Sequence, residues 1–140
     1  MSTATKTTSK NYSFKTTYVV YASPEKVFEA LTDSSIIATW GGGLSIVEHK
    51  KGGKFEMFDG WVKGEVLSFI LDKELSYSWL PAEWKKNSTP SVVLFKLKVH
   101  PAGTEIILEH TGLPTEDESN KTESGWVDFV LEPLNEYFTS

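Results

Sequence analysis

The sequence predicts an α+β fold in which about seven antiparallel strands cover a long C-terminal helix, with two short helices after the first strand. Residues 41–110 alternate apolar and polar side chains between closely spaced turn residues, as antiparallel strands do. Residues 122–138 repeat apolar side chains every three or four positions, as one face of a helix does. A sheet with one apolar face needs a cover, and this helix supplies it.

The first strand is predicted over residues 11–22, which are mostly β-branched or aromatic. Ser23 and Pro24 then end the strand and begin a helix, because serine caps helices and proline suits the first helical position. Apolar side chains follow at helical spacing as far as Leu31. Residues 32–35 end this helix and cap a shorter one that continues to Trp40.

Six further strands are predicted, each bounded by turn residues. The Asp59-Gly60 pair is a strong hairpin signal. Every second residue of these strands is apolar, for example Val93, Leu97 and Val99. One face of the sheet is therefore expected to be buried, and the other to face water. The predicted strands are residues 44–49, 54–58, 61–70, 74–80, 92–100 and 104–110.

The last element is an amphipathic helix that follows a predicted polar loop over residues 114–121. Pro133 lies inside this helix, where it removes a backbone donor and crowds the carbonyl of Phe129. We therefore expect a kink at that position. The apolar face consists of Trp126, Phe129, Val130, Leu134, Tyr137 and Phe138.

Length and composition favour one domain. The chain has 140 residues, of which 39% are hydrophobic, and no cysteine, which excludes disulfides and thiolate sites. We expect a disordered tail over residues 1–10 and a single domain over residues 11–140. No apolar signal segment opens the chain and no stretch is long enough to span a membrane, so we expect a cytoplasmic protein.

The charge pattern argues against nucleic acid as a partner. All 14 basic residues are lysine, and the formal net charge is −5. Arginine supplies the bidentate contacts that commonly read bases and clamp phosphates, so a chain without it is poorly suited to either task. The acidic C-terminal part has two explanations, a solvated helix face and a surface for a basic partner.

Aromatic residues carry the main functional signal, with five Trp, five Tyr and eight Phe in the chain. Small-molecule sites are concave and largely aromatic or apolar, so we expect such a site between the sheet and the last helix, although packing explains each single tryptophan as well. Tyr77 and His110 would orient the ligand, and Trp84 would lie near the mouth as a lid anchor or a partner contact. The candidate ligand-binding residues are Phe55, Tyr77, Trp79, Trp84, Phe95, Leu108, His110, Trp126, Phe129 and Val130.

Catalytic and metal signals are weak. The histidines His49, His100 and His110 are scattered without a close pair, which does not favour a metal site. No phosphate loop, nucleophile elbow or zinc-protease motif occurs. A hydrogen-bonded core position explains His110 better than a pocket role does, and only His110 and Tyr77 could serve as inward-facing acid and base groups. We therefore expect no catalytic residue, no metal and no cofactor.

The order of elements resembles the helix-grip fold of the START-like, birch-pollen-allergen-like (SRPBCC) superfamily. Within it, the sequence is similar to the domain family named after the activator of the heat-shock protein 90 ATPase. The similarity extends from Phe14 to Phe138. It is carried by residues 22–32, Trp40, residues 52–55, 64–67, 75–79, 103–104 and 108–113, and the pair Gly125-Trp126.

The resemblance implies a cavity between the sheet and the helix, and relatives that bind lipids, sterols or other apolar molecules. We therefore expect non-catalytic binding of a small hydrophobic or amphipathic ligand, lipid-like or aromatic. Two alternatives stay open: a co-chaperone-like module with a chaperone ATPase as partner, and a cyclase-like enzyme. The eukaryotic co-chaperone joins a similar domain to a separate N-terminal domain that does much of the stimulation. This chain has no room for that domain, so we expect the family name not to describe its activity.

Overall fold

The structure, a computed structural model, describes residues 12–84 and 88–140. Within these residues, seven antiparallel strands form one sheet with the order β1-β7-β6-β5-β4-β3-β2, which confirms the predicted fold class. The predicted tail, Asn11 and residues 85–87 lie outside the described residues. The strands are β1 (Tyr12–Val20), β2 (Ile46–Val47), β3 (Lys54–Met57), β4 (Val62–Ile70), β5 (Glu74–Pro81), β6 (Ser91–His100) and β7 (Gly103–Leu113).

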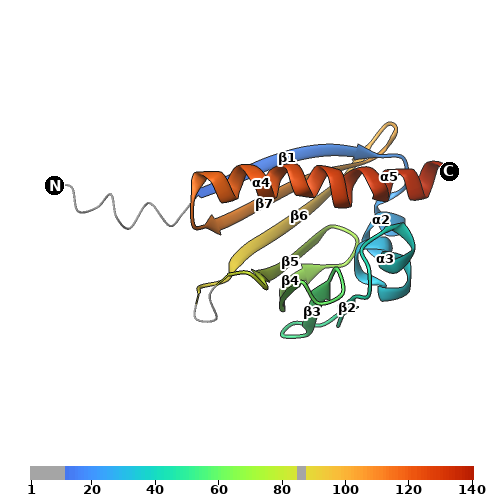
Figure 1. Cartoon of the computed structure of the whole chain (residues 1–140). Helices are drawn as coiled ribbons and strands as arrows, with labels where there is room; N and C mark the ends of the chain where they lie inside the picture. The colour runs from blue at the N-terminus through green and yellow to red at the C-terminus, as the bar shows by residue number, and fades with distance from the viewer. Residues whose placement is uncertain (1–11, 85–87) are drawn as a thin grey trace.

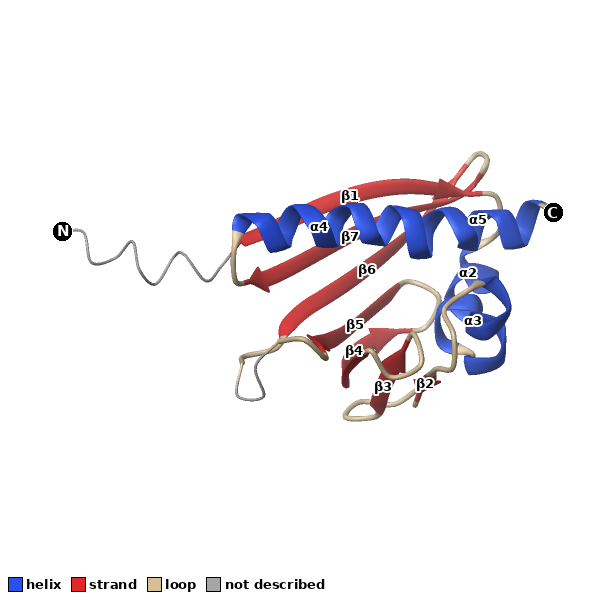
Figure 2. Ribbon diagram, in the orientation of Figure 1, coloured by secondary structure: helices blue, strands red, loops and turns tan. Residues whose placement is uncertain are grey.

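Two short helices follow β1, and a long helical segment ends the chain. This C-terminal segment runs along the sheet beside β1 and β7, while the two short helices are grouped near one end of it (Figure 1). The same arrangement, coloured by secondary structure, is seen in Figure 2. The helices are α2 (Pro24–Thr32) and α3 (Ser34–Trp40), and then α4 (Glu116–Trp126), the π-helix η1 (Val127–Leu131) and α5 (Glu132–Thr139).

Polar contacts fix the C-terminal segment to the first strand. The Thr16 hydroxyl donates to the Glu123 carboxylate at 2.8 Å. Further along, the backbone N–H of Tyr21 donates to the side-chain oxygen of Asn135 at 3.0 Å. The first bond holds α4 on β1, and the second holds α5 on the residue that follows β1.

The short helices begin as the sequence predicts. Ser23 is extended and Pro24 opens α2, although the Ser23 side chain makes no capping bond. Asp33 caps α3, since its carboxylate accepts from the backbone N–H groups of Ser35 and Ile36 at 2.9 and 3.1 Å. Hydrogen bonds, above all that from the Ser35 hydroxyl, lower the pKa of Asp33.

The prediction of a polar loop over residues 114–121 is wrong, because α4 already begins at Glu116. Thr115 caps it by accepting a bond of 3.0 Å from the backbone N–H of Glu118. Three acidic residues in the first turn complement the positive end of the helix dipole. A threonine followed three positions later by glutamate is a known helix-start signal, so the low hydropathy of this stretch was misleading.

Pro133 is accommodated by a change of helix type. The five residues of η1 directly precede α5, and the backbone N–H of Glu132 bonds the carbonyl of Val127, five residues earlier. A π-turn is wider than an α-turn, which relieves the crowding between the proline ring and the preceding turn. The sequence predicted a kink at Pro133, and what the structure has there is a π-helix directly before α5.

Two strand predictions need correction. Residues 44–49 yield only the two-residue strand β2, because Leu44 bonds the hairpin turn instead: its N–H donates to the Asp59 carboxylate at 2.8 Å, and its carbonyl accepts from the Asp59 N–H at 3.0 Å. In β6 the burial alternation ends at Leu97, and Val99 is 85% exposed near the β6–β7 turn rather than on the dry face.

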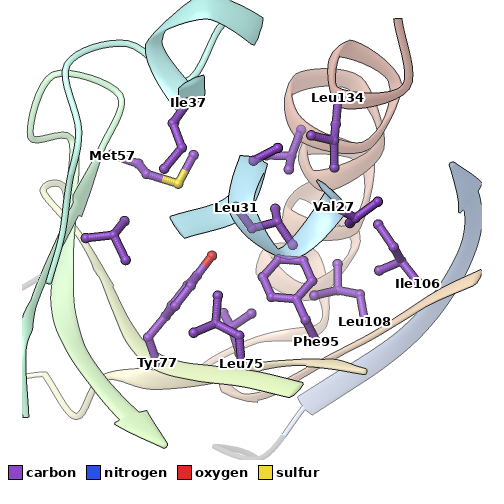
Figure 3. Packing of buried hydrophobic residues seen from close by; sticks show 14 of the residues in the cluster. Val27, Leu31, Ile37, Met57, Leu75, Tyr77, Phe95, Ile106, Leu108 and Leu134 are labelled. Carbon is purple, nitrogen blue, oxygen red and sulfur yellow. The ribbon is translucent and has the colours of Figure 1, made fainter. Parts of the chain in front are cut away.

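The core lies between the sheet and the helices. In Figure 3, Val27 and Leu31 from α2 and Leu134 from α5 point toward Phe95 and Leu108 on the sheet. All five are buried. Among the helices that the structure describes, none is long and apolar enough to cross a membrane.

Candidate functional site

Aromatic side chains fill the centre of the space between the sheet and the C-terminal segment. Phe55 stacks on Tyr77 with ring centres 3.8 Å apart, and Trp79 lies 4.8 Å from Trp126. Phe95 meets Trp126 edge-on at 5.4 Å. These five side chains are buried. A ligand site therefore has to lie at the margin of this cluster.

His110 is fully buried beneath the same cluster. Its Nδ1 accepts from the indole N–H of Trp126 at 2.9 Å, and its Nε2 lies 2.8 Å from the Ser91 hydroxyl. That hydroxyl also donates to the Trp79 carbonyl at 3.0 Å. Burial lowers the pKa of His110 to about 3, so the imidazole is neutral at physiological pH.

A pocket of about 170 Å³ opens at the margin of the cluster, where turns of the sheet meet the C-terminal segment. Trp79 and Trp126, only 4% and 2% exposed, lie at its inner end. Trp61 and Phe129, 40% and 64% exposed, lie at its mouth. The lining residues are Phe58, Trp61, Trp79, Glu83, Glu118, Lys121, Thr122, Gly125, Trp126, Phe129 and Val130.

The C-terminal side of the pocket is built on the helix irregularity. Phe129 and Val130 both belong to η1, and Val130 is buried while Phe129 is exposed. Gly125, one turn earlier, leaves room because it has no side chain: a Cβ added there would meet only Phe129 Cδ2, at 3.9 Å. π-turns inside α-helices are frequent at functional sites.

The rim of the pocket carries two carboxylates that are bonded to tryptophans. The indole N–H of Trp61 donates to Glu83 at 2.6 Å. The indole N–H of Trp84 lies within 3.4 Å of a Glu118 oxygen, at the limit of a hydrogen bond. The first bond connects the β3–β4 turn with the turn after β5, and the second connects the turn after β5 with the first turn of α4.

Four of the ten predicted ligand-binding residues, Trp79, Trp126, Phe129 and Val130, line this pocket. Trp84 is half-buried and contacts the rim through Glu118. The remaining five are core residues that do not line this pocket: Phe55, Tyr77, Phe95, Leu108 and His110.

Sequence reasoning missed the contribution of the β3–β4 turn. Phe58 and Trp61 flank the predicted Asp59-Gly60 hairpin, in which Phe58 and Asp59 have positive φ angles of 56° and 60°. Because of this left-handed backbone, Phe58 and Trp61 do not continue the alternation of inward and outward side chains along the strands. The turn signal was visible in the sequence, but the direction of its side chains was not.

A second pocket, of about 440 Å³, lies beside α2 and has both apolar and charged lining residues, with Glu25, Glu29 and Asp72 among the charged ones. No group of three or more His, Cys, Asp or Glu within residues 12–84 and 88–140 could hold a metal ion. Tyr77 and His110, the acid and base candidates of a cyclase-like reaction, line neither pocket. Burial also raises the pKa of Tyr77, which disfavours its ionised form.

Several curated proteins are similar to this chain. "Activator of 90 kDa heat shock protein ATPase homolog 1" from Mus musculus and that from Homo sapiens are each 26% identical over 116 residues. The aligned region covers 83% of this chain and 34% of each relative. This chain therefore spans about a third of the length of these curated relatives.

Solved structures share the fold. Protein MLL2253 from Mesorhizobium loti superposes with a TM-score of 0.79 and 26% identity, covering 91% of this chain and 97% of that one. PFC0360w, an HSP90 activator from Plasmodium falciparum, has a TM-score of 0.79 and 23% identity, covering 93% and 96%. The predicted helix-grip architecture is thereby confirmed.

Residues 21–139 match the family described as "Activator of Hsp90 ATPase homolog 1-like protein". This range includes every described element except β1, and it contains all the residues that line the pocket. The resemblance drawn from the sequence is confirmed, and the chain belongs to the activator of Hsp90 ATPase homolog 1-like family.

Proposed function

We propose that this protein binds a small hydrophobic or amphipathic molecule, without catalysis, in the pocket between the sheet turns and the C-terminal segment. The observation that carries the proposal is the pocket itself: aromatic side chains from the sheet and from η1 surround one space, with a few polar groups at its rim. Ligand sites in proteins combine these same two features.

The size of the pocket limits the ligand. Its volume of about 170 Å³ is close to that of a cavity of roughly 150 Å³ that holds one benzene molecule. The space further inside is occupied by Trp79 and Trp126, which pack against each other. A single ring or a short branched chain therefore fits, whereas a sterol or a whole lipid tail does not.

A soluble amphipathic probe, 3,3-dimethylbutan-1-ol, tests the proposal. We expect it to shift the indole N–H resonances of Trp61 and Trp126 saturably in a two-dimensional NMR titration. The indole of Trp40 serves as an internal control, because it bonds the Ala30 carbonyl at 2.9 Å and does not line the pocket. Shifts that do not saturate, or that affect all three indoles equally, would contradict binding at this site.

Matched variants make the test specific. Gly125→Leu places a side chain in the pocket, where only Phe129 lies within 4 Å of the new Cβ. Ser124→Leu adds the same side chain at the neighbouring exposed position, which does not line the pocket. We expect the first variant to lose binding and the second to keep it. Equal binding by both variants would contradict this location.

A second candidate function is favoured by the family match over residues 21–139, namely interaction with a chaperone ATPase. Adding the purified chain to Hsp90 would then raise the ATPase rate of Hsp90, or isothermal titration calorimetry would detect a complex between the two. The Gly125→Leu variant separates the two functions, since a partner surface works with the pocket filled. No change in ATPase rate and no heat of binding would contradict this candidate.

A further inference from the structure

We propose that the pocket is selective for an organic cation, a ligand that carries an N-methylated ammonium group, over a neutral ligand of the same shape. This inference rests on the proposed function above and specifies its ligand class. It follows from two properties of the described residues: the orientation of the rings in the pocket, and the charge at its rim.

Rings in different planes surround the pocket. Trp61 meets Trp79 edge-on, with centroids 6.2 Å apart and planes at 79°, and meets Phe58 at 6.2 Å and 68°. Trp79 and Trp126 are tilted by 38° at 4.8 Å, and Phe129 stands at the mouth. These rings are not coplanar and all of them line the pocket, so a bound group would have aromatic rings on several sides. A cation within about 6 Å of a ring face is attracted by its quadrupole.

The rim adds negative charge. Glu83 and Glu118 both line the pocket, and among the described residues neither carboxylate forms an ion pair. Each one instead faces a neutral indole N–H, from Trp61 and Trp84 respectively. Lys121 is the one cation among the described residues that line the pocket, and it is exposed, so these lining residues have a formal net charge of −1 (two carboxylates and one ammonium).

A methylated ammonium group fits these two properties together. Its methyl groups pack against aromatic rings as an apolar body would, while its charge is delocalised and weakly hydrated. It has no need of a directional acceptor, which suits carboxylates that already accept bonds from Trp61 and Trp84. A neutral ligand would cover the carboxylates without compensating them, and an anion would be repelled by them.

Choline and 3,3-dimethylbutan-1-ol form a suitable probe pair, because they have the same shape and differ in charge. We expect choline to bind more tightly by about fivefold or more at low salt, as cation–π attraction and the rim charge act together. Added salt should reduce the difference in affinity between choline and the alcohol, because it screens the charge at the rim. Trimethyl-lysine in a short peptide carries the same group on a protein, and tighter binding of that peptide than of choline would support the inference and assign the source.

Charge variants test the mechanism with the hydrogen bonds preserved. Glu83→Gln and Glu118→Gln keep an oxygen for the indole N–H groups but remove the charge. We expect each to weaken choline binding by about threefold or more and leave the alcohol unaffected. Glu116→Gln makes the same change on the same helical turn outside the pocket and should alter neither. Lys121→Gln should strengthen choline binding alone.

The outcomes separate this inference from the proposed function. Equal affinity of the two probes, or choline binding that is insensitive to both pocket carboxylates, would overturn selectivity for a cation and leave the proposed pocket intact. Failure of both probes to bind would overturn the proposed pocket itself. Preference for choline that is lost in Glu83→Gln and Glu118→Gln, and retained in Glu116→Gln, would support both.

Discussion

Trp126 donates its indole N–H to Nδ1 of His110, and this bond fixes the proton positions of a buried network. An indole nitrogen can only donate, so Nδ1 carries no proton and Nε2 does. Nε2 then donates to the Ser91 hydroxyl, which in turn donates to the Trp79 carbonyl. The network joins the C-terminal segment to β5, β6 and β7, and every polar side-chain group in it is satisfied.

Breaking this network should be costly. His110→Leu leaves the Trp126 indole N–H buried without an acceptor, so we expect the free energy of unfolding to fall by about 2–4 kcal/mol. Urea denaturation measures this change in the free energy of unfolding. The double variant with Trp126→Phe removes both partners, and its loss should be smaller than the sum of the two single losses. Strict additivity would show that the two residues do not interact.

Stability should also depend on pH through His110. Burial lowers its pKa from 6.5 to about 3, so the unfolded chain binds the proton more readily than the folded one. The stabilisation is therefore complete above about pH 6.5 and decreases below it, by up to about 1.4 kcal/mol per pH unit until about pH 3. Unfolding curves between pH 7 and pH 4.5 measure this slope.

The control for the pH effect is His110→Gln, which keeps one acceptor and one donor but does not titrate. We expect its stability to fall less steeply over the same pH range than that of the natural sequence. Slopes that coincide would assign the acid sensitivity to the carboxylates instead.

Two glycines should respond in opposite ways to the same substitution. At Gly64 an added Cβ would lie 2.0 Å from the Ser78 carbonyl oxygen, so Gly64→Ala should reduce stability by about 3 kcal/mol. At Gly125 the added Cβ has space, and alanine favours the helix, so Gly125→Ala should raise stability by about 0.5–1 kcal/mol. Thermal unfolding compares them. A large loss at Gly125 would mean that the pocket is closed there.

Tyr77 has a hydroxyl group that is poorly matched to its surroundings. The residue is 2% exposed, and its oxygen points into the interior among apolar side chains (Figure 3). Within the part of the chain that the structure describes, this hydroxyl forms no hydrogen bond with another residue. Tyr77→Phe keeps the stacking on Phe55 and should raise the free energy of unfolding by about 1 kcal/mol. A loss of stability would instead indicate a buried water bonded to the hydroxyl.

The architecture was predictable because period-two and helical patterns are strong in this chain. The start of α4 was missed because low hydropathy outweighed the capping signal of Thr115 and Glu118. The π-helix could not be read from the sequence beyond an irregularity at Pro133. Its form depends on how the widened turn satisfies the backbone donors against the sheet.

The candidate site was predictable only in part. Strand parity correctly placed Phe55, Phe95 and His110 on the inner face, but parity gives the face of a residue and not its depth. In the structure these three residues are part of the core and do not line the pocket. The carboxylates of Glu83 and Glu118 are 35 positions apart and meet only through tertiary packing, so no local pattern indicated their shared rim.

The π-helix also sets the rotational phase of the chain end. A π-turn is equivalent to one additional residue inserted into an α-helix. If the same five residues, 127–131, formed a regular α-helix instead, everything beyond them would be rotated by about 100°. Leu134 would then leave the core, and Asn135 would lose its alignment with Tyr21. The wide turn thus accommodates one extra residue while Leu134 stays in the core and Asn135 stays opposite Tyr21.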